Sequence, residues 1–410
     1  MIFISDIRLY DDPKTMEHIQ ALAFNRTASS TGETEALNYI ESELIRNNIN
    51  PEVEHFNWRG PLSILMRTSY LLILINLILF RMILIVVTYF IIKYAFSRLR
   101  ELSFISREES KSIFTLIKSK NKIPKRPIVI ITAHYDSISA NLPYRLQVVI
   151  FFIYRLIVVF YGIVFFTFAG IFFLDLLRVI PVASFLTVFI SFSSVGGVLI
   201  SIPILYLVFK ERPSSGAIDN ASGVAISIEL AKIFNKNPLE NTDVLILWPG
   251  AEEWGLKGSK AFCKNHFKSL KKIYDLDNSY NINIDMVGSY IGLLNKTGLI
   301  FRRKMNKNLN GIFDATAKQL NIPLKVFNKV ISPKSDYKSF KKYAKRNRTK
   351  FQVSFFHSSK DSKYIHSLKD TPDKCSLESL NGCINICHQV LRSIDMRVEG
   401  VKKSQLTYAV

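Results

Sequence analysis

Apolar residues follow two contrasting patterns along this 410-residue chain. In the first, they alternate with polar residues, as in PEVEHFNW, or recur every three to four residues, as over residues 14–48. Ser29, Ser30 and Thr31, before Gly32 and Glu33, predict a capped helix start within that range. The apolar patterns of IVIITAHYDS and DVLILW predict strands, and later segments predict a helix over 305–320 and a final helix from about Leu377 to Met396. Strands that alternate with helices favour an α/β fold.

The second pattern is long and almost wholly apolar. Residues 62–96, 148–174 and 179–209 are each long enough to cross a bilayer about 30 Å thick, which needs about 20 residues. We therefore predict a helical or re-entrant membrane hairpin over residues 61–96 and a transmembrane helical hairpin over residues 146–209. Residues 1–60, 97–145 and 210–410 would together form one domain.

Charge narrows the partners that the chain could bind. With 54 Lys+Arg against 33 Asp+Glu, the net charge is +21. Such a charge has three ordinary explanations: binding to nucleic acid, attraction to an anionic membrane surface, or a general compositional bias. We find no recognition helix, zinc-finger pattern or aromatic-interleaved basic stripe, so we expect no nucleic-acid partner. Basic residues flank the apolar segments on the side of the folded domain. By the positive-inside rule, they predict an integral membrane protein with the lipid bilayer as a partner and a cytoplasmic domain.

Two further features bear on the compartment. The first residues, MIFISDIRLYDDPKTMEH, contain acidic side chains before any sustained apolar run, so we expect no secretory signal peptide. Four cysteines are too few for a disulfide framework in a chain of this length, which agrees with a reducing compartment. Cys383, Cys387 and His388 match no strong zinc pattern, and we interpret them as core residues.

Acidic and histidine residues recur where apolar strands end. They lie in TAHYDS, GAIDNASGVA, PGAEEWGLKGS, NIDMVG, SDYKSF and YIHSLKDTPDK. In an open α/β sheet the carboxyl ends of the strands are where sites gather. Histidine with carboxylate suits zinc, and two histidines with three carboxylates are the right count for two zinc ions that share one carboxylate. A glutamate that binds no metal is the usual group to move the proton.

Single members of this set have ordinary structural explanations. His134 alone is more often a satisfied core or surface histidine, and Asp285 alone is as often a turn former or a helix cap. His266 and His357 keep that structural interpretation. The prediction of a metal site rests on the whole set.

In this order, the segments resemble the di-zinc aminopeptidases of clan MH, the family that contains bacterial leucyl aminopeptidase and aminopeptidase Y. The resemblance covers essentially all of the chain outside the apolar segments. It implies a mixed, mostly parallel central sheet with helices on both faces, as in zinc-dependent exopeptidases. The bridging aspartate normally follows the first histidine closely in this family, whereas here residues 148–209 intervene.

The resemblance also implies roles for individual residues. His134 and Asp285 would bind one zinc ion, Glu253 and His366 the other, and Asp219 would bridge the two. Glu252 would be the general base that takes a proton from a metal-bridging water, and Asp136 would orient the His134 imidazole. The substrate pocket would be lined by Ser335, Asp336, Tyr337 and Phe340.

These expectations describe a membrane-anchored zinc metallopeptidase, an aminopeptidase whose partners are peptide or protein N-termini. One alternative is a non-catalytic subunit of a membrane complex on the same fold, which would be expected to lose ligands or the base. A second is a glutaminyl cyclase, similar in fold but working with a single zinc ion. Cobalt or manganese remains an alternative to zinc.

Overall fold

The computed structural model describes residues 14–59, 107–139 and 214–407 apart from Ile300, with scattered positions between 146 and 174. The chain divides into two compact units: Met1–Phe56, Glu109–Ser139 and Pro213–Val410 form one, and Asn57–Glu108 with Ala140–Arg212 form the other. The predicted hairpins at 61–96 and 146–209 therefore lie outside the described residues, apart from those scattered positions.

One sheet organises the first unit. Within the described residues it has nine strands in the order β1-β2-β4-β3-β5-β9-β6-β7, with β8 paired to β6. The strands are β1 (Glu52–Arg59), β2 (Arg107–Ile117), β3 (Ile128–Thr132), β4 (Asp243–Trp248), β5 (Tyr280–Ile284), β6 (Ile291–Thr297), β7 (Arg303–Lys304), β8 (Leu324–Lys329) and β9 (Gln352–Phe356). The central strands β4, β3, β5 and β9 are parallel, while β2 pairs with β4 and β6 with β9 in antiparallel fashion. The predicted mixed α/β fold is confirmed.

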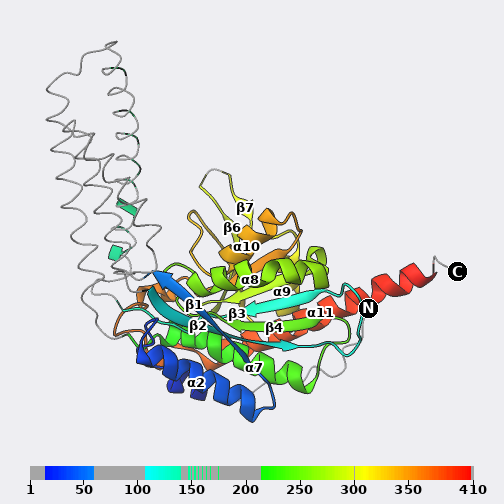
Figure 1. Ribbon diagram of the computed structural model, residues 1–410, viewed down its shortest axis with the longest axis horizontal. Helices are drawn as coiled ribbons and strands as arrows, with labels where there is room; N and C mark the ends of the chain where they lie inside the picture. Colours follow the sequence, from blue (N-terminus) through cyan, green and yellow to red (C-terminus); the bar gives the residue numbers. More distant parts are fainter. Residues whose placement is uncertain are drawn as a thin grey trace, which may run out of the picture. The chain divides into compact units, whose positions relative to one another are not determined.

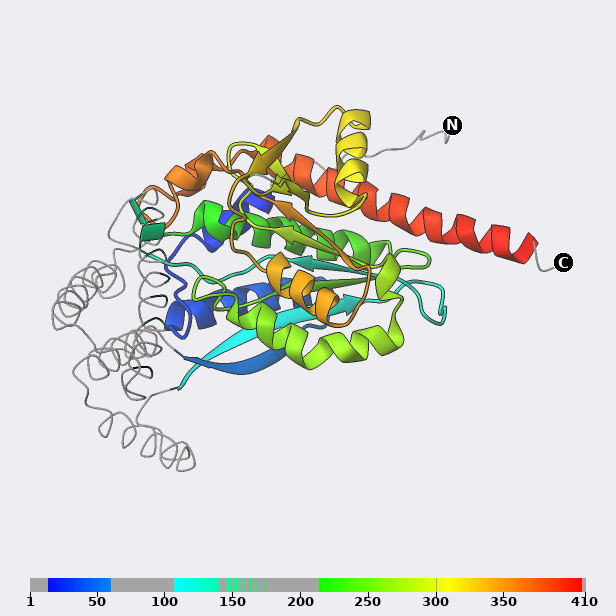
Figure 2. The same cartoon turned by 90° about the horizontal axis from the view of Figure 1, so that it is seen from above.

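Helices cover both faces of this sheet (Figure 1). They are α1 (Lys14–Ala21), α2 (Thr31–Arg46), α7 (Ser222–Lys236), α8 (Lys257–Ile273), α9 (Leu309–Gln319), α10 (Tyr337–Arg346) and α11 (Leu377–Thr407). Helix α7 contacts α1, α2 and α11 on one face, and α8 contacts α10 on the other. Figure 2 shows the C-terminal part of α11 extending beyond the sheet. Two layers of helices thus leave the ends of the strands as the accessible edge.

The central strands form where the sequence is continuously apolar. All five residues of β3 and all six of β4 are buried, because parallel strands between two helical layers have no solvent-facing side. On the α8 and α10 side, Phe262 and Phe340 pack with ring centroids 6.3 Å apart. On the α7 side, the indole nitrogen of Trp248 donates to Ser227 Oγ at 2.7 Å. These contacts fix β4 between the two layers.

Helix α2 begins where the capping residues predict. Ser30 is the N-cap, and its Oγ accepts a hydrogen bond from the backbone N–H of Glu33 at 3.2 Å. The Glu33 carboxylate in turn accepts from the backbone N–H of Ser29 at 2.6 Å. This reciprocal arrangement satisfies amide groups that the first helical turn leaves without a partner.

The prediction of an integral membrane protein with a cytoplasmic domain requires correction. Among the described residues, no helix combines the length and the apolar character needed to cross a membrane. Even the 31-residue α11 is interrupted by charged residues, including Glu378, Arg392 and Asp395, and charged side chains are costly inside a bilayer. The structure therefore gives no support to the predicted transmembrane insertions.

Candidate metal centre

Acidic and histidine side chains gather at the carboxyl edge of the parallel strands. His134 follows β3 by two residues, Glu253 lies in the loop after β4, and Asp285 follows β5 directly. Asp219 reaches the same edge from the turn that precedes α7. Because parallel strands end at one edge, their loops converge on a rigid frame. The fold thus brings together side chains that lie up to 151 residues apart in the sequence.

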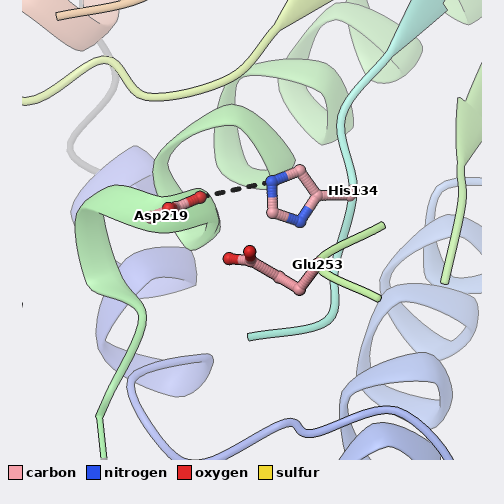
Figure 3. Close-up of side chains that lie close together, drawn as sticks. All are labelled: His134, Asp219 and Glu253. Atoms are coloured by element: carbon pink, nitrogen blue, oxygen red, sulfur yellow. Dashed lines mark ion pairs between the residues drawn. The ribbon is translucent and has the colours of Figure 1, made fainter. Parts of the chain in front are cut away.

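The Asp219 carboxylate lies between two histidines. Its Oδ1 is 3.2 Å from His134 Nε2 and its Oδ2 is 3.3 Å from His366 Nε2. Each histidine also faces a second carboxylate: Asp285 Oδ1 lies 3.7 Å from His134 Nε2, and Glu253 Oε1 lies 3.2 Å from His366 Nε2. Figure 3 shows His134, Asp219 and Glu253 pointing toward one another. One carboxylate is therefore shared between two histidine and carboxylate pairs.

The electrostatics of this cluster favour positive charge at its centre. Burial alone would lower the pKa of His134, but hydrogen bonds to Asp136, Asp219 and Asp285 raise it well above its usual value. Burial likewise opposes the charged form of His366, yet Glu253 and Asp219 raise its pKa to about 10. The two histidines in turn lower the pKa of Asp219 against the effect of burial. Without a metal ion the histidines hold protons, and a metal cation would compete with these protons for the same nitrogen lone pairs.

The donor set fits a zinc site. His134, Asp219 and Glu253 each offer one ligand atom, and these atoms all lie within 4.8 Å of one another. Imidazole nitrogen combined with carboxylate oxygen is a donor set that zinc prefers. All three residues are largely buried, with side-chain exposures of 1%, 7% and 10%. The structure therefore supports the metal-binding part of the prediction, while the assignment of each ligand to one of two ions remains a proposal.

Asp136 holds the turn that carries the two glutamates. Its Oδ1 accepts from the backbone N–H of Glu252 at 2.9 Å, and its Oδ2 accepts from the N–H of Glu253 at 3.2 Å. The same carboxylate lies 3.6 Å from His134 Nδ1, on the ring edge opposite to Asp219. The Asp136 backbone oxygen is closer to His134 Nδ1, at 3.1 Å. Asp136 thus lies beside the histidine and holds the backbone of both glutamates, while its orienting role remains a prediction.

Glu252 is in a different environment from Glu253. It is 7% exposed, and burial raises its pKa well above the usual value, with Asp336 and Glu253 adding to the shift and His134 opposing it. Glu253 instead faces His366. Ala251, the residue before Glu252, has a φ of 50°, which lies in the left-handed region. Neighbouring glutamates on this strained turn therefore point to different surroundings.

The four predicted pocket residues are all buried. Ser335 Oγ accepts from the side chain of Asn283 at 2.5 Å, and Tyr337 lies against Phe355 with ring centroids 4.8 Å apart. Phe340 is a core residue on α10 that packs against Phe262 of α8. Asp336 has no exposed surface, and burial raises its pKa to about 7. Their contact with a substrate remains a prediction.

The remaining histidines and cysteines have structural surroundings. His266 Nε2 lies 3.4 Å from Glu54 Oε2, and its ring packs against that of Phe262 with centroids 4.6 Å apart. His357 Nδ1 lies 3.4 Å from the backbone oxygen of Asp285, and its ring stacks on Phe355. It therefore supports the Asp285 backbone. All four cysteines are buried and free.

Two residues next to the cluster were not identified from the sequence. Arg26 is fully buried and donates hydrogen bonds to the loops that precede and follow the predicted ligands. Asp370, also fully buried, accepts from the backbone N–H of Ile218 at 2.6 Å. A signal existed for Asp370, because it lies four residues after His366 in the same motif. Arg26 had none beyond its charge.

Residues 199–391 match peptidase family M28. A probable zinc metalloprotease from Pyrenophora tritici-repentis (strain Pt-1C-BFP) is 39% identical over 74 residues, 18% of this chain and 16% of that protein. The chain thus matches only a small part of this curated relative.

Solved structures share the fold over nearly the whole chain. An aminopeptidase from Aneurinibacillus sp. strain AM-1 superimposes with a TM-score of 0.54 and 15% identity, covering 93% of both chains. A glutaminyl cyclase from an Acidobacteriales bacterium gives a TM-score of 0.55 and 15% identity, covering 97% of this chain and 99% of the other. At this identity, the likeness shows the fold alone.

The match to peptidase family M28 over residues 199–391 and the short match to a probable zinc metalloprotease support the peptidase part of the prediction. The solved structures support the predicted resemblance to zinc aminopeptidases at the level of the fold. The transmembrane insertions that accompanied this prediction are not supported.

Proposed function

We propose that this protein is a two-zinc aminopeptidase that hydrolyses the N-terminal peptide bond of peptides or proteins, with Glu252 as the general base. The observation that carries the proposal is the Asp219 carboxylate, which presents one oxygen to His134 and the other to His366. A carboxylate that serves one metal ion needs no second histidine on its other oxygen. The M28 match and the aminopeptidase likeness support the reaction class.

His134 and Asp285 would hold one zinc ion, His366 and Glu253 the other, and Asp219 would contact both. When bound, a zinc pair supplies Lewis-acid activation of the attacking water and of the scissile carbonyl. Asp136 would orient the His134 ring through Nδ1, which lies 3.1 Å from the Asp136 backbone oxygen and 3.6 Å from its carboxylate, on the edge opposite to the nitrogen that faces the other proposed ligands. The protein thereby fixes its donors before a substrate arrives.

Glu252 would take the proton from the attacking water and deliver it to the leaving amine. Its backbone N–H is held by Asp136, while its side chain faces none of the histidine nitrogens at ion-pair distance among the described residues. A buried carboxylate binds a proton more readily than an exposed one, and the raised pKa of Glu252 reflects this. Positive charge at the neighbouring ligands favours its ionised form, which a general base requires.

The glutaminyl cyclase alternative has one specific observation in its favour, the TM-score of 0.55 with a cyclase over 97% of this chain. The second histidine and carboxylate pair, His134 with Asp285, favours two ions over the single zinc ion expected of a cyclase. A non-catalytic subunit is disfavoured because Glu252 and all the ligand positions are present.

The test compares wild type with Glu252→Gln and Glu253→Gln, two isosteric changes one residue apart. Substrates are a panel of aminoacyl anilides and, for the cyclase alternative, peptides with N-terminal glutamine. We expect Glu252→Gln to retain its zinc and lose about 10²- to 10⁴-fold in kcat. Glu253→Gln should instead lose zinc. If wild type cyclises N-terminal glutamine but releases no amino acid, the aminopeptidase proposal is rejected. If Glu252→Gln keeps the kcat of wild type, the role of Glu252 as general base is rejected.

A further inference from the structure

Arg26 is a fully buried arginine whose guanidinium donates to backbone oxygens. Its Nε donates to Tyr135 O at 2.8 Å, and its Nη2 donates to Gly216 O at 2.9 Å. Its Nη1 is shared among the carbonyls of Leu22, Phe24 and Ser215. A charge removed from water in this way needs several partners. Arg26 is therefore fixed within the chain segments around it.

Those segments carry two of the proposed ligands. Tyr135 directly follows His134, and Gly216 lies three residues before Asp219. The backbone N–H of Arg26 also donates to Ser137 Oγ at 2.9 Å, which adds a contact to the first segment. Because a guanidinium presents its donors in a rigid planar fork, it fixes the spacing of the two carbonyls that it contacts. Arg26 therefore links the His134 segment to the Asp219 segment.

The close approach of Arg26 requires glycine at position 216. Gly216 has a φ of 59°, and a Cβ atom there would lie 2.8 Å from Arg26 Nη2 and 2.7 Å from Ser137 Cβ. Both the left-handed backbone and the lack of space exclude larger side chains. The contact between the guanidinium and this segment is thus built into the backbone.

Asp370 holds the same segment from its amide side. Its Oδ1 accepts from the N–H of Ile218 at 2.6 Å and its Oδ2 from the N–H of Asp219 at 3.4 Å. Ser215 Oγ donates to the backbone oxygen of Asp370. Asp370 lies four residues after His366, so these bonds connect the Asp219 segment to the loop of the second histidine.

We propose that Arg26 and Asp370 are positioning residues which together hold Asp219 midway between His134 and His366, and so set the geometry of the shared carboxylate. Arg26 fixes the segment to the His134 side, and Asp370 fixes it to the His366 side. The proposal rests on the two-zinc site of the proposed function. Groups that orient metal ligands typically change metal affinity or activity by about 10- to 100-fold when they are altered.

The charge of Arg26 supports this role. Burial lowers its pKa to about 10, while the nearby carboxylates of Asp370, Asp136 and Asp219 oppose that shift. The guanidinium therefore stays protonated at neutral pH. It provides a fixed positive charge beside a cluster of carboxylates. Among the described residues it donates its hydrogen bonds to backbone carbonyls, so the carboxylate oxygens stay available as metal ligands.

Asp395 offers a matched control for Asp370. It is also a buried carboxylate that accepts from two consecutive backbone N–H groups, those of Glu240 and Asn241, both at 2.8 Å. It lies on α11 and contacts no proposed ligand in these bonds. Asp370→Asn and Asp395→Asn therefore remove the same kind of capping interaction, and only the first affects the segment of Asp219.

The experiment measures zinc affinity of the full chain by competition with a chromogenic chelator, and the visible absorption spectrum of the cobalt-substituted protein. We expect Asp370→Asn to lower zinc affinity about 10- to 100-fold and to change the cobalt spectrum. Asp395→Asn should leave both as in wild type, although it lowers the urea midpoint similarly. Arg26→Lys, which keeps the charge but loses the fork, should resemble Asp370→Asn.

The positioning role and the proposed function fail on different outcomes. If Asp370→Asn keeps the zinc affinity and cobalt spectrum of wild type, the positioning role is overturned and the peptidase proposal stands. The same holds if Asp395→Asn loses as much zinc affinity as Asp370→Asn. Wild type that binds zinc but releases no amino acid defeats the proposed function without affecting this comparison. Wild type that binds no zinc overturns both. If Arg26→Lys does not fold, the two aspartate variants still decide.

Discussion

The number of zinc ions bound by single variants should report directly on the role of Asp219. Each half of the cluster contains three protein donors: His134, Asp285 and one oxygen of Asp219 on one side, and His366, Glu253 and the other oxygen of Asp219 on the other. Three protein donors with one open position are typical of catalytic zinc. Removing a donor leaves two, which is too few for a tight site.

The effect of a substitution therefore depends on whether the donor is private or shared. We expect about two zinc ions per chain in wild type and about one in His134→Ala or His366→Ala, because the other half keeps its three donors. Asp219→Ala changes a single residue but removes one donor from each half, so this variant should bind close to no zinc. A shared ligand thus predicts that Asp219→Ala loses about two zinc ions, twice the loss expected of any other single substitution.

The assay is equilibrium dialysis against a zinc buffer, followed by elemental analysis and a circular dichroism check of folding. His266→Ala is the matched control, since its Nε2 lies 3.4 Å from a carboxylate oxygen of Glu54 away from the cluster; it should keep the wild-type count. Retention of one ion by Asp219→Ala would refute the shared carboxylate. A wild-type count of one that is insensitive to His134→Ala would instead favour a single-zinc site of the cyclase type.

Two further predictions concern stability. The buried Asp243 carboxylate accepts hydrogen bonds from Arg126 Nε at 2.5 Å and from Nη2 at 2.8 Å, so Asp243→Asn should lower the free energy of unfolding, measured in urea, by about 3–5 kcal/mol. Asp314→Asn, at the exposed ion pair with Lys318, should change that free energy by under about 1 kcal/mol. Equal effects of the two substitutions would contradict this prediction. Burial raises the pKa of Glu33 from 4.5 to about 7, so the folded state binds this proton more tightly than the unfolded state. The free energy of unfolding should therefore rise by up to about 3 kcal/mol as the pH falls from 7 to 4.5. Glu33→Gln should flatten that dependence between pH 5 and 8, and an unchanged profile would show that another group causes it.

The strands that position the metal centre could be predicted because burial on both faces leaves an uninterrupted apolar run. DVLILW forms β4 as expected, and the first five residues of IVIITAHYDS form β3. The helix start at Ser30 was also correct, because the capping residues are local. The predicted end of the last helix at Met396 was wrong, since α11 continues to Thr407. Apolar periodicity marks only the part of a helix that packs, and it stops before the helix does.

The candidate site was predictable only in part. His134, Glu253 and Asp285 lie in loops that follow strands, Asp219 lies just before α7, and their motifs pointed to one edge of the sheet. His366 lies in a longer loop between β9 and α11. Arg26 has no such pattern, because its acceptors are backbone oxygens 109 and 190 residues away. Any residue type can supply a carbonyl oxygen, so no side chain in the sequence marks the other end of these bonds. Such residues become visible only once the fold is known.

The hydrogen bonds of Arg26 also bear on how much of the chain a working enzyme needs. Every proposed ligand lies at or after residue 134, so a fragment that begins at β3 would retain the complete donor set. That fragment would lack the guanidinium that connects Tyr135 to Gly216. Under the proposed function, the smallest active fragment would therefore begin before Arg26, well ahead of the first proposed ligand. The segment between α1 and α2, which carries Arg26, would support the metal centre without supplying a ligand to it.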